Sequence, residues 1–492
     1  MEDEYFNVEE FKHYGEKTLD IIAQDLILEI EKGDAFPLPE PGFLRKLLPK
    51  DAPENPEDLD SILKDTREKI LPNMTKWRHP KFYGNMPALI THSAILAEMI
   101  GLALNNPMHT WSICPAGTEL ENIVLDWCAK AFGLDSRFLF ENGGGGCIYN
   151  TIGEGNLLMA HAARYKKRKE LGIDTRDPKN LQFVAYYSSG CHYSTLRALT
   201  LKDVPIIREV PVKLNKETGT FTLDPVEFAA QVQKDVDEGL IPFFFGAVIG
   251  GTAVGNADPI PELAKICQQH KMWLNVDAAW TGASFVCPEF LKEYGAGLEG
   301  ANSIAINFGK WIFAGNCAAL FWVSDANLFT ESLEIHPEYL KNRVAGANKV
   351  VDYKDWTIST RRRFTALRVW YALRTLGIAG IRKNIYRGVE LTQHLEKLVT
   401  SNPRFELVCK RELAILCFRL VKDKDGKRYE DSELTAINKK FLQGIIKSGE
   451  FYLAGADLDK TFFLRFILNN PSTNEKHIDA LWAHMEKVLQ DI

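Results

Sequence analysis

The sequence of 492 residues contains no run of 18 apolar residues, and its acidic start, Met1–Phe6, has neither the basic nor the apolar part of a secretion signal. We therefore expect a cytoplasmic protein without a membrane span. The chain also has no basic run: 59 Lys and Arg oppose 65 Asp and Glu, so nucleic acid is not an expected partner. The nine cysteines are scattered and include no Cys-x-x-Cys pair, so we expect neither a zinc site nor a disulfide framework.

The pattern of apolar residues and prolines divides the chain into three regions. Hydrophobic residues make up 46% and charged residues 25%, which is typical of a globular protein too long for one core. Region 1–91 is helical but broken by six prolines between positions 37 and 56, and it is predicted to be an arm. Its amphipathic segment 59–71 can bury apolar side chains only against another surface, so we expect a homodimer.

Regions 92–375 and 376–492 are predicted to be a large and a small domain. In the large one, short apolar runs at 181–187, 243–249, 273–277 and 303–307 alternate with amphipathic helices, which indicates an α/β fold around a buried sheet. A capping box at Thr118 predicts a helix start there, with a buried face that includes Ile123 and Trp127. In the small one, strand-like runs at 413–420 and 462–468 precede a final helix, which predicts an α+β unit.

A glycine run at 143–146 leads to a polar stretch at 149–156 that opens a helix. The start of a helix exposes unpaired N–H groups and the positive end of the helix dipole, so this segment suits a phosphate. A surface turn explains the same residues equally well, because the spacing matches neither a dinucleotide-binding fingerprint nor a P-loop.

Three further residues are ambiguous singly and informative together. Asp277 ends an apolar strand and is a helix cap or a placed charge; Lys310 stands in an apolar turn, where it has a lowered pKa or merely reaches solvent. His192 is a structural histidine or a ring that stacks on a ligand. A phosphate site, a carboxylate for a pyridine nitrogen and an amine for an aldehyde are what pyridoxal 5'-phosphate requires. We therefore predict this cofactor.

Six segments carry a resemblance to the group II pyridoxal-phosphate decarboxylases, nearest to the aromatic L-amino-acid decarboxylases. They are His79-Pro80-Lys81-Phe82, Pro115–Glu121, Gly239–Phe244, Asn275–Trp280, Cys287–Phe290 and Asn307–Trp311. The resemblance runs from about residue 5 to the C-terminus. It implies the fold type I architecture of the aspartate aminotransferase class, with a mostly parallel seven-stranded sheet, a small C-terminal α+β domain and an N-terminal helical arm.

The resemblance also implies roles for single residues. Lys310 would hold the cofactor aldehyde as a Schiff base, Asp277 would pair with the pyridinium nitrogen and His192 would stack on the ring. The other implied cofactor contacts are Ile152, Gly153, Thr252, Asn307 and Ala279. Tyr339 matches the tyrosine that protonates the product carbanion, and related aldehyde synthases carry Phe at this place. The implied reaction is decarboxylation of an L-amino acid, most often an aromatic one, to an amine.

The chain departs from that family on the substrate side. Asn85-Met86-Pro87-Ala88 stands where Tyr-Phe-Pro-Thr is usual, Gly309 replaces a usual His and Gly153 a usual Ser. The expected substrate-pocket residues are Asn85, Pro87, Ala88, His109, Trp111, Asn316 and Arg361. This more polar set keeps other functions open: an aldehyde synthase, a decarboxylase of histidine or an acidic amino acid, or a non-catalytic dimeric homologue.

Overall fold

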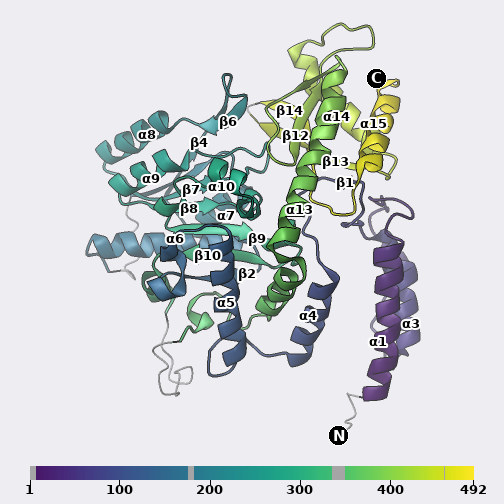
Figure 1. Cartoon of the computed structure of the whole chain (residues 1–492), viewed down its shortest axis with the longest axis horizontal. Helices are drawn as coiled ribbons and strands as arrows, with labels where there is room; N and C mark the ends of the chain where they lie inside the picture. Colours follow the sequence, from purple (N-terminus) through teal and green to yellow (C-terminus); the bar gives the residue numbers. More distant parts are fainter. Residues whose placement is uncertain (1–6, 175–181, 335–349, 459) are drawn as a thin grey trace.

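The computed structural model describes residues 7–174, 182–334, 350–458 and 460–492. A seven-stranded sheet forms its centre, in the order β2-β10-β9-β8-β7-β3-β4 (Figure 1). The strands are β2 (Gly145–Tyr149), β3 (Phe183–Ser188), β4 (Ile206–Val210), β7 (Ile241–Val248), β8 (Trp273–Asp277), β9 (Ser303–Asn307) and β10 (Ala319–Val323). Of these seven strands, β10 alone runs opposite to the other six, so the predicted mostly parallel sheet is confirmed.

Both faces of this sheet are buried. Along β3, Val184 and Tyr186 belong to one hydrophobic core, while Phe183, Ala185 and Tyr187 belong to another on the opposite face. Such double burial explains why the strands read as continuous apolar runs in the sequence. The covering helices are α5 (Pro115–Ala131), α6 (Ile152–Glu170), α7 (Tyr193–Leu201), α8 (Pro225–Asp237), α9 (Ile260–Gln269), α10 (Pro288–Tyr294) and α12 (Ala326–Leu333).

Glycines in β2 serve packing. A Cβ at Gly146 would lie 2.3 Å from the carbonyl oxygen of Phe321, and one at Gly144 would lie 2.1 Å from that of Arg137. Only a residue without a side chain fits against backbone at such distances. Gly144, just before β2, and Gly146 are therefore required by packing at the sheet edge, whereas a Cβ at Gly143 would meet nothing within 4 Å. The phosphate-type helix start lies further along, where α6 begins at Ile152.

Helix α5 differs from its predicted form. It begins at Pro115, a residue preorganised for the first helical turn, so Thr118 lies inside the helix and caps nothing. Its buried face contains Val124, Leu125 and Cys128, whereas Ile123 and Trp127 of the predicted face are 44% and 47% exposed.

A long helix leads to the second sheet. Helix α13 (Thr365–Ser401) is interrupted at Gly377, whose φ of 61° and ψ of 166° are not helical. Beyond it lies a five-stranded sheet in the order β1 (Phe82–Tyr83), β13 (Tyr452–Leu458), β14 (Thr461–Ile467), β12 (Ile415–Leu420) and β11 (Phe405–Leu407), with helices α14 (Asp431–Ile446) and α15 (Glu475–Leu489). The kink falls beside the predicted boundary at 375 and 376, and the three domain ranges remain a prediction.

The N-terminal helices stand along one side of the molecule (Figure 1). Helices α1 (Val8–Ala23), α2 (Phe43–Leu47) and α3 (Leu59–Asp65) contain no buried residue, and α4 (His92–Leu104) contains three. A short ribbon of β5 (Val212–Asn215) and β6 (Thr220–Leu223) completes the strands. Across the described ranges, no helix has the length and apolar content needed to cross a bilayer.

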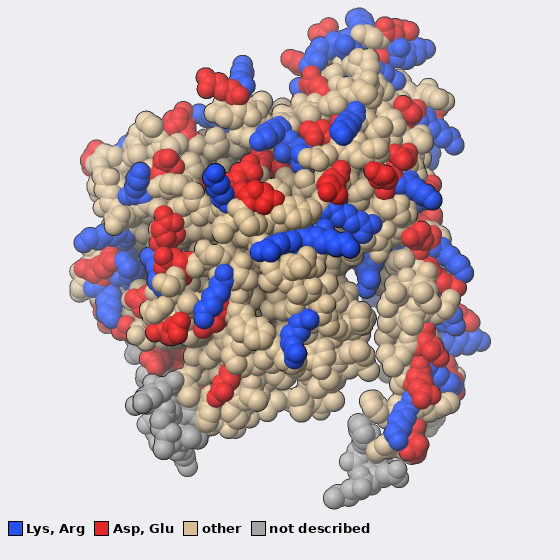
Figure 2. Space-filling model, viewed as in Figure 1, with Lys and Arg blue, Asp and Glu red and all other residues tan. Residues whose placement is uncertain are grey.

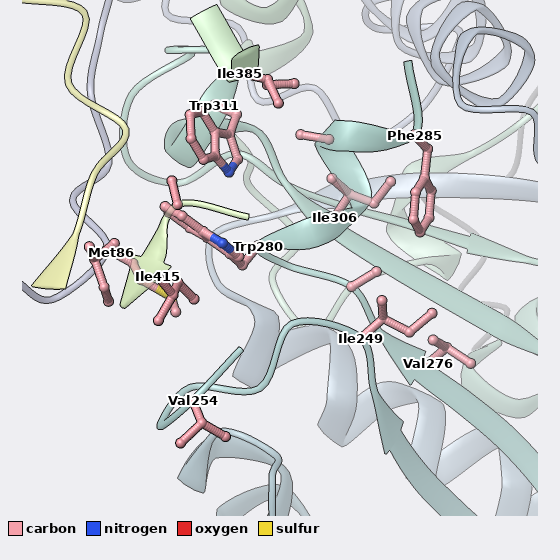
Figure 3. Packing of buried hydrophobic residues seen from close by; sticks show 14 of the residues in the cluster. Met86, Ile249, Val254, Val276, Trp280, Phe285, Ile306, Trp311, Ile385 and Ile415 are labelled. Carbon is pink, nitrogen blue, oxygen red and sulfur yellow. The ribbon is translucent and has the colours of Figure 1, made fainter. Parts of the chain in front are cut away.

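Two tryptophans brace the carboxyl edge of the central sheet. Trp280 follows β8 and Trp311 follows β9, and their rings lie 4.7 Å apart between centroids at an angle of 49° (Figure 3). Both are buried, and Ile306 and Ile415 belong to the same core. Trp280 lies three residues after Asp277, and Trp311 lies directly after Lys310. The contact between the two rings therefore fixes the distance between the segments that carry Asp277 and Lys310.

Candidate active site

Four predicted residues converge at one edge of the sheet. Asp277 and Asn307 end β8 and β9, while Thr252 and His192 lie in the segments that follow β7 and β3. Since these strands are parallel, their carboxyl ends meet on the same side, which is where α/β proteins bind ligands.

A cavity of about 810 Å³ lies at this edge. It is lined by every predicted cofactor contact: Ile152, Gly153, His192, Thr252, Asp277, Ala279, Asn307 and Lys310. The sequence prediction therefore assembled residues that are up to 158 positions apart in the chain (152 and 310) around one space. The volume is in the range of sites for small molecules and cofactors.

Lys310 lies in the short helix α11 (Phe308–Trp311), which Asn307 caps by accepting a hydrogen bond from the Gly309 N–H at 3.0 Å. Its Nζ is 3.6 Å from the sulfur of Met86. Burial lowers the pKa of Lys310 to about 8, an effect that Asp277 opposes and Arg465 reinforces. At pH 7 about a tenth of this amine is uncharged, far more than for an ordinary lysine, and the uncharged amine is the form that attacks an aldehyde.

Asp277 is only 3% exposed, and its Oδ1 accepts a hydrogen bond from the Ala279 N–H at 3.0 Å. Burial raises the pKa of Asp277, while Lys310 and the Ala279 N–H lower it. A positive charge near Asp277 stabilises its ionised form, and the protonated pyridine nitrogen of the cofactor would supply such a charge.

The start of α6 offers two donors. Thr151 caps the helix by accepting from the Glu154 N–H at 3.2 Å, and the Asn150 N–H donates to the Glu154 carboxylate at 3.1 Å. Among the described residues, none accepts a hydrogen bond from the N–H of Ile152 or Gly153, and both residues line the cavity. These free N–H groups at the positive end of a 19-residue helix fit a phosphate.

His192 is the N-cap of α7: its Nδ1 accepts a hydrogen bond from the Ser194 N–H at 3.3 Å and lies 2.9 Å from the Ser194 hydroxyl. Burial lowers its pKa to about 4, and the positive charges of Lys310 and Arg465 add to this effect. The imidazole is therefore neutral at physiological pH, with its proton on Nε2 because Nδ1 accepts. His192 therefore caps a helix and also presents a neutral ring at the cavity, so its two predicted roles are compatible.

Arg465 is a cavity residue that the sequence prediction missed. It lies on β14 of the other sheet, is 7% exposed and donates through Nη1 to the carbonyl oxygen of Thr252. Its Nε has no partner, and no carboxylate pairs with it among the described residues. The signal was present in the sequence, since Arg465 interrupts the apolar run 462–468, but nothing local connects that run to the cavity.

The predicted substrate-side residues are only partly together. Asn85 and Asn316 line the cavity, along with the unpredicted Met86, whereas Pro87, Ala88, His109, Trp111 and Arg361 do not line it in the single chain. Arg361 is exposed, and the Trp111 indole donates to Glu119 at 2.9 Å. Tyr339 lies outside the described residues. Membership of these residues in a substrate pocket stays a prediction.

The departures at 85–88 and at 309 fit each other. A Cβ at Gly309 would lie 2.7 Å from the Ala88 Cβ and 2.6 Å from the Gly315 carbonyl oxygen. The missing side chain lets the segment before Ala88 approach α11, and the Leu89 N–H donates to the Gly309 carbonyl at 2.8 Å. Asn85 and Met86 hold φ values of 59° and 49°, a conformation that is costly for a methionine and is retained where packing enforces it.

Comparison with known proteins places this geometry in a family. The model of the pyridoxal-dependent decarboxylase conserved domain matches residues 41–421. The chain belongs to the pyridoxal-dependent decarboxylase family. Phenylacetaldehyde synthase of Petunia hybrida is 35% identical over 96% of this chain and 93% of its own, and tyrosine decarboxylase 3 of Petroselinum crispum is 34% identical over 98% and 92%.

A solved structure agrees with this assignment. The structure of Oryza sativa TDC with pyridoxal phosphate and tryptamine covers 99% of both chains with a TM-score of 0.93 and 29% identity. The fold of this decarboxylase is therefore fold type I, its cofactor is pyridoxal 5'-phosphate, and its class is carboxy-lyase. The free N–H groups of α6, the carboxylate of Asp277 and the amine of Lys310, whose pKa is lowered to about 8, suit the three polar parts of that cofactor.

We expect covalent attachment of the cofactor to depend on Lys310. Borohydride reduction of the loaded protein, followed by peptide mass spectrometry, should find the pyridoxyl group on Lys310 and on no peptide of the Lys310→Ala variant. Because the pKa of Lys310 is about 8, the attachment rate of cofactor-free protein should rise with pH, reach half of its maximum near pH 8 and level off above about pH 9.

Lys167 provides the matched control for this experiment. Burial lowers its pKa to about 8 as well, but its Nζ donates to the His270 carbonyl oxygen at 3.0 Å and it does not line the cavity. The Lys167→Ala variant should bind cofactor as the unaltered protein does. Attachment that survives in Lys310→Ala would contradict the assignment.

Proposed function

We propose that this protein decarboxylates an aromatic L-amino acid to the corresponding amine and carbon dioxide with pyridoxal 5'-phosphate as cofactor. The observation that carries the proposal is the convergence of Lys310, Asp277, His192 and the α6 start around one cavity. The relatives of known activity support it, since tyrosine and tryptophan decarboxylases align with nearly the whole chain.

The bound cofactor supplies an electron sink for the bond that breaks at the substrate α-carbon. The protein's own groups serve that chemistry. Lys310 would hold the aldehyde through its amine, and the Asp277 carboxylate would keep the ring nitrogen protonated. His192 presents a neutral ring face, and the N–H groups of Ile152 and Gly153 hold the phosphate, with Thr252, Asn307 and Ala279 beside them.

Tyr339 is proposed to deliver the proton to the α-carbon after carbon dioxide leaves. Its hydroxyl favours simple decarboxylation, because related aldehyde synthases carry Phe at this place. The second candidate function, oxidative conversion to an aldehyde, is kept because phenylacetaldehyde synthases of Petunia hybrida and Arabidopsis thaliana are each 35% identical to this chain.

The altered substrate side bears on which amino acid is accepted. Asn85 and Asn316 place amide groups at the cavity, and Met86 places a flexible thioether beside Lys310. Both asparagines are exposed in the single chain, and the Asn85 amide donates to the Tyr452 hydroxyl at 3.1 Å. Amide groups at the mouth of the cavity can bind a substrate hydroxyl or ring N–H, so they favour substrates with these groups over phenylalanine. Tyrosine, 3,4-dihydroxyphenylalanine and 5-hydroxytryptophan are the expected class. Histidine and glutamate are the alternatives.

A product panel tests this function. The loaded protein should release carbon dioxide and amine in equal amounts from at least one hydroxylated aromatic amino acid, with little peroxide. In aerated buffer the Tyr339→Phe variant should lose amine and form aldehyde, ammonia and peroxide from the same substrate, with dissolved dioxygen as the oxidant and water as co-reactant, because the proton donor for the α-carbon is missing.

The matched control for that variant is Tyr193→Phe, which alters a tyrosine that lines the cavity next to His192. It should keep amine formation. Peroxide from the unaltered protein would favour the aldehyde synthase, turnover of only histidine or glutamate would change the substrate class, and no turnover of any of them would contradict the proposal.

We propose that Arg465 binds the carboxylate of the substrate. Its guanidinium is buried at the cavity and has an unpartnered Nε. Hydrogen bonds to charged groups contribute about 1.5–3 kcal/mol, so a buried arginine of this kind discriminates strongly for anions.

Replacing Arg465 by Met should therefore raise KM by about 10- to 100-fold with a smaller change in kcat, since the methionine fills the space without the charge. Steady-state kinetics measures both constants. Arg419→Met is the control, because Arg419 lies on the neighbouring strand β12 and pairs with Glu406 away from the cavity. An unchanged KM in Arg465→Met would contradict this role.

We propose that the protein is a homodimer. Apolar side chains are exposed on four helices at one side of the molecule: Val8, Phe11, Leu19, Leu59, Ile62, Leu96, Met99, Ile100, Leu102, Leu104, Ile123 and Trp127. Figure 2 shows few charged side chains over the lower part of the body, where Figure 1 places α4 and α5. Exposed apolar surface of this extent is typical of an interface.

Sedimentation velocity of the full chain should accordingly give a dimer. Ile100→Lys, on the exposed face of α4, should shift the protein toward monomer, because a charge in an apolar interface lacks a partner. Val226→Lys alters an exposed residue of α8, elsewhere on the surface, and should leave the dimer intact. A monomeric unaltered protein would contradict the proposal.

A further inference from the structure

A second buried carboxylate stands behind the cavity and has no role in the chemistry described so far. Asp258 lies just before α9 and is 5% exposed. Its Oδ1 accepts a hydrogen bond from the Ser188 hydroxyl at 2.9 Å, and its Oδ2 accepts one from the Val248 N–H at 2.8 Å. Burying a carboxylate costs desolvation free energy, and hydrogen bonds from two neutral donors offset only part of that cost. The surrounding fold must supply the rest of the free energy that keeps Asp258 in this position.

The two hydrogen-bond partners of Asp258 are the last residues of two neighbouring strands. Ser188 is the last residue of β3 and Val248 is the last residue of β7, and the two strands pair in parallel. His192 follows Ser188 by four residues and Thr252 follows Val248 by four. The Asp258 carboxylate therefore bonds to the residues from which both segments begin, the one that carries His192 and the one that carries Thr252.

The two segments are tied to each other beyond the strand ends. The Thr252 N–H donates to the Gly190 carbonyl oxygen at 3.2 Å, and the Gly190 N–H donates to the Ser188 hydroxyl oxygen at 3.3 Å. A Cβ at Gly190 would lie 2.4 Å from Nδ2 of Asn256, so the segments pack without slack. A shift at Ser188 is therefore transmitted to both.

We propose that Asp258 is a positioning residue, which sets His192 and Thr252 at a fixed spacing against the cofactor through Ser188 and Val248. This inference rests on the cofactor-binding roles proposed above for His192 and Thr252. Asp258 touches neither the cavity nor, by its contacts, either of those two side chains, so it acts only through the strand ends.

The electrostatic surroundings of Asp258 are simple. Burial raises the pKa of Asp258 to about 7, and the bonds from Val248 and Ser188 only partly oppose this effect. The titratable group that faces it is the Cys191 thiol, whose pKa is raised by burial and then by Asp258 and Asp277. Among the described residues, no lysine, arginine or histidine acts on it.

Cofactor affinity of three variants tests the proposal. Asp258→Ala removes both hydrogen bonds and should weaken binding of pyridoxal 5'-phosphate by about 10-fold or more, measured by fluorescence titration. Asp258→Asn should stay within about 3-fold, because its amide oxygen accepts from Val248 and its NH₂ donates to Ser188. Ser188→Ala breaks only the link toward His192, and should weaken the circular dichroism of the bound cofactor.

A thermodynamic cycle separates positioning from general loss of structure. With His192→Ala in the background, the effect of Ser188→Ala on affinity should shrink, because the ring it positions is gone. The control is Asp235→Asn, which alters another buried carboxylate that binds the Tyr186 hydroxyl at 2.8 Å, far from the cavity on α8. It should leave affinity and dichroism unchanged.

A measurement without cofactor adds a signature of the carboxylate itself. Since the pKa of Asp258 is higher in the folded protein than the ordinary 3.8, the folded state binds more protons between these values, and stability falls as pH rises from about 4 to about 7. In urea unfolding, Asp258→Asn should therefore gain stability relative to the unaltered protein as pH rises from about 4 to about 7, and the difference should level off above pH 7.

The outcomes are distinct. Unchanged cofactor affinity and dichroism in Asp258→Ala and Ser188→Ala, or effects that simply add to those of His192→Ala, would overturn the inference while the proposed function stands. If Asp258→Ala does not fold, Asp258→Asn and Ser188→Ala decide. An unaltered protein that binds no pyridoxal 5'-phosphate would instead overturn the proposed function.

Discussion

A buried chain of hydrogen-bonded side chains holds the site together from beneath. Asn156 donates to Thr195 at 3.2 Å and accepts from Asn275 at 3.1 Å; Asn275 accepts from Ser303 at 2.7 Å, and Ser303 accepts from the Trp273 indole at 2.8 Å. These residues belong to α6, α7, β8 and β9, the four elements that bring the phosphate donors, His192, Asp277 and Lys310 to the cavity. Buried polar chains of this kind tolerate few alternative arrangements, because each unmet partner is costly.

The charges in the cavity follow from that rigid frame. Lys310, Arg465 and Arg197 are the basic side chains that line the cavity, Asp277 and Glu154 are the acidic ones, and His192 is neutral. The lining therefore has one more basic than acidic side chain before any ligand enters. Burial disfavours each charge, which lowers the pKa of the lysine and raises that of the aspartate. An incoming phosphate or carboxylate offsets the excess, and this electrostatic preference complements the free N–H groups of α6.

The residues predicted to contact the cofactor line one cavity because each of them follows a recognisable element, while their roles stay a prediction. β8 and β9 have the predicted bounds, and Asp277 and Lys310 follow from where those strands end. Arg465 was not predicted because it reaches the cavity from the other sheet, and no local sequence pattern indicates a contact between the two sheets. The predicted buried face of α5 was correct for Val124 but wrong for Ile123 and Trp127, which follow the helical periodicity and are 44% and 47% exposed.

The substrate half obeys a different constraint. Cofactor contacts must meet a fixed chemical group, so residue type and position in the fold identify them. A substrate wall is defined by shape, and shape depends on pairs that only the structure reveals, such as the space that Gly309 leaves for Ala88. The left-handed backbone at Asn85 and Met86 carries strain that the surrounding packing must overcome. Because the buried frame beneath the cofactor does not extend to this segment, the wall can be rebuilt while the chemistry is retained.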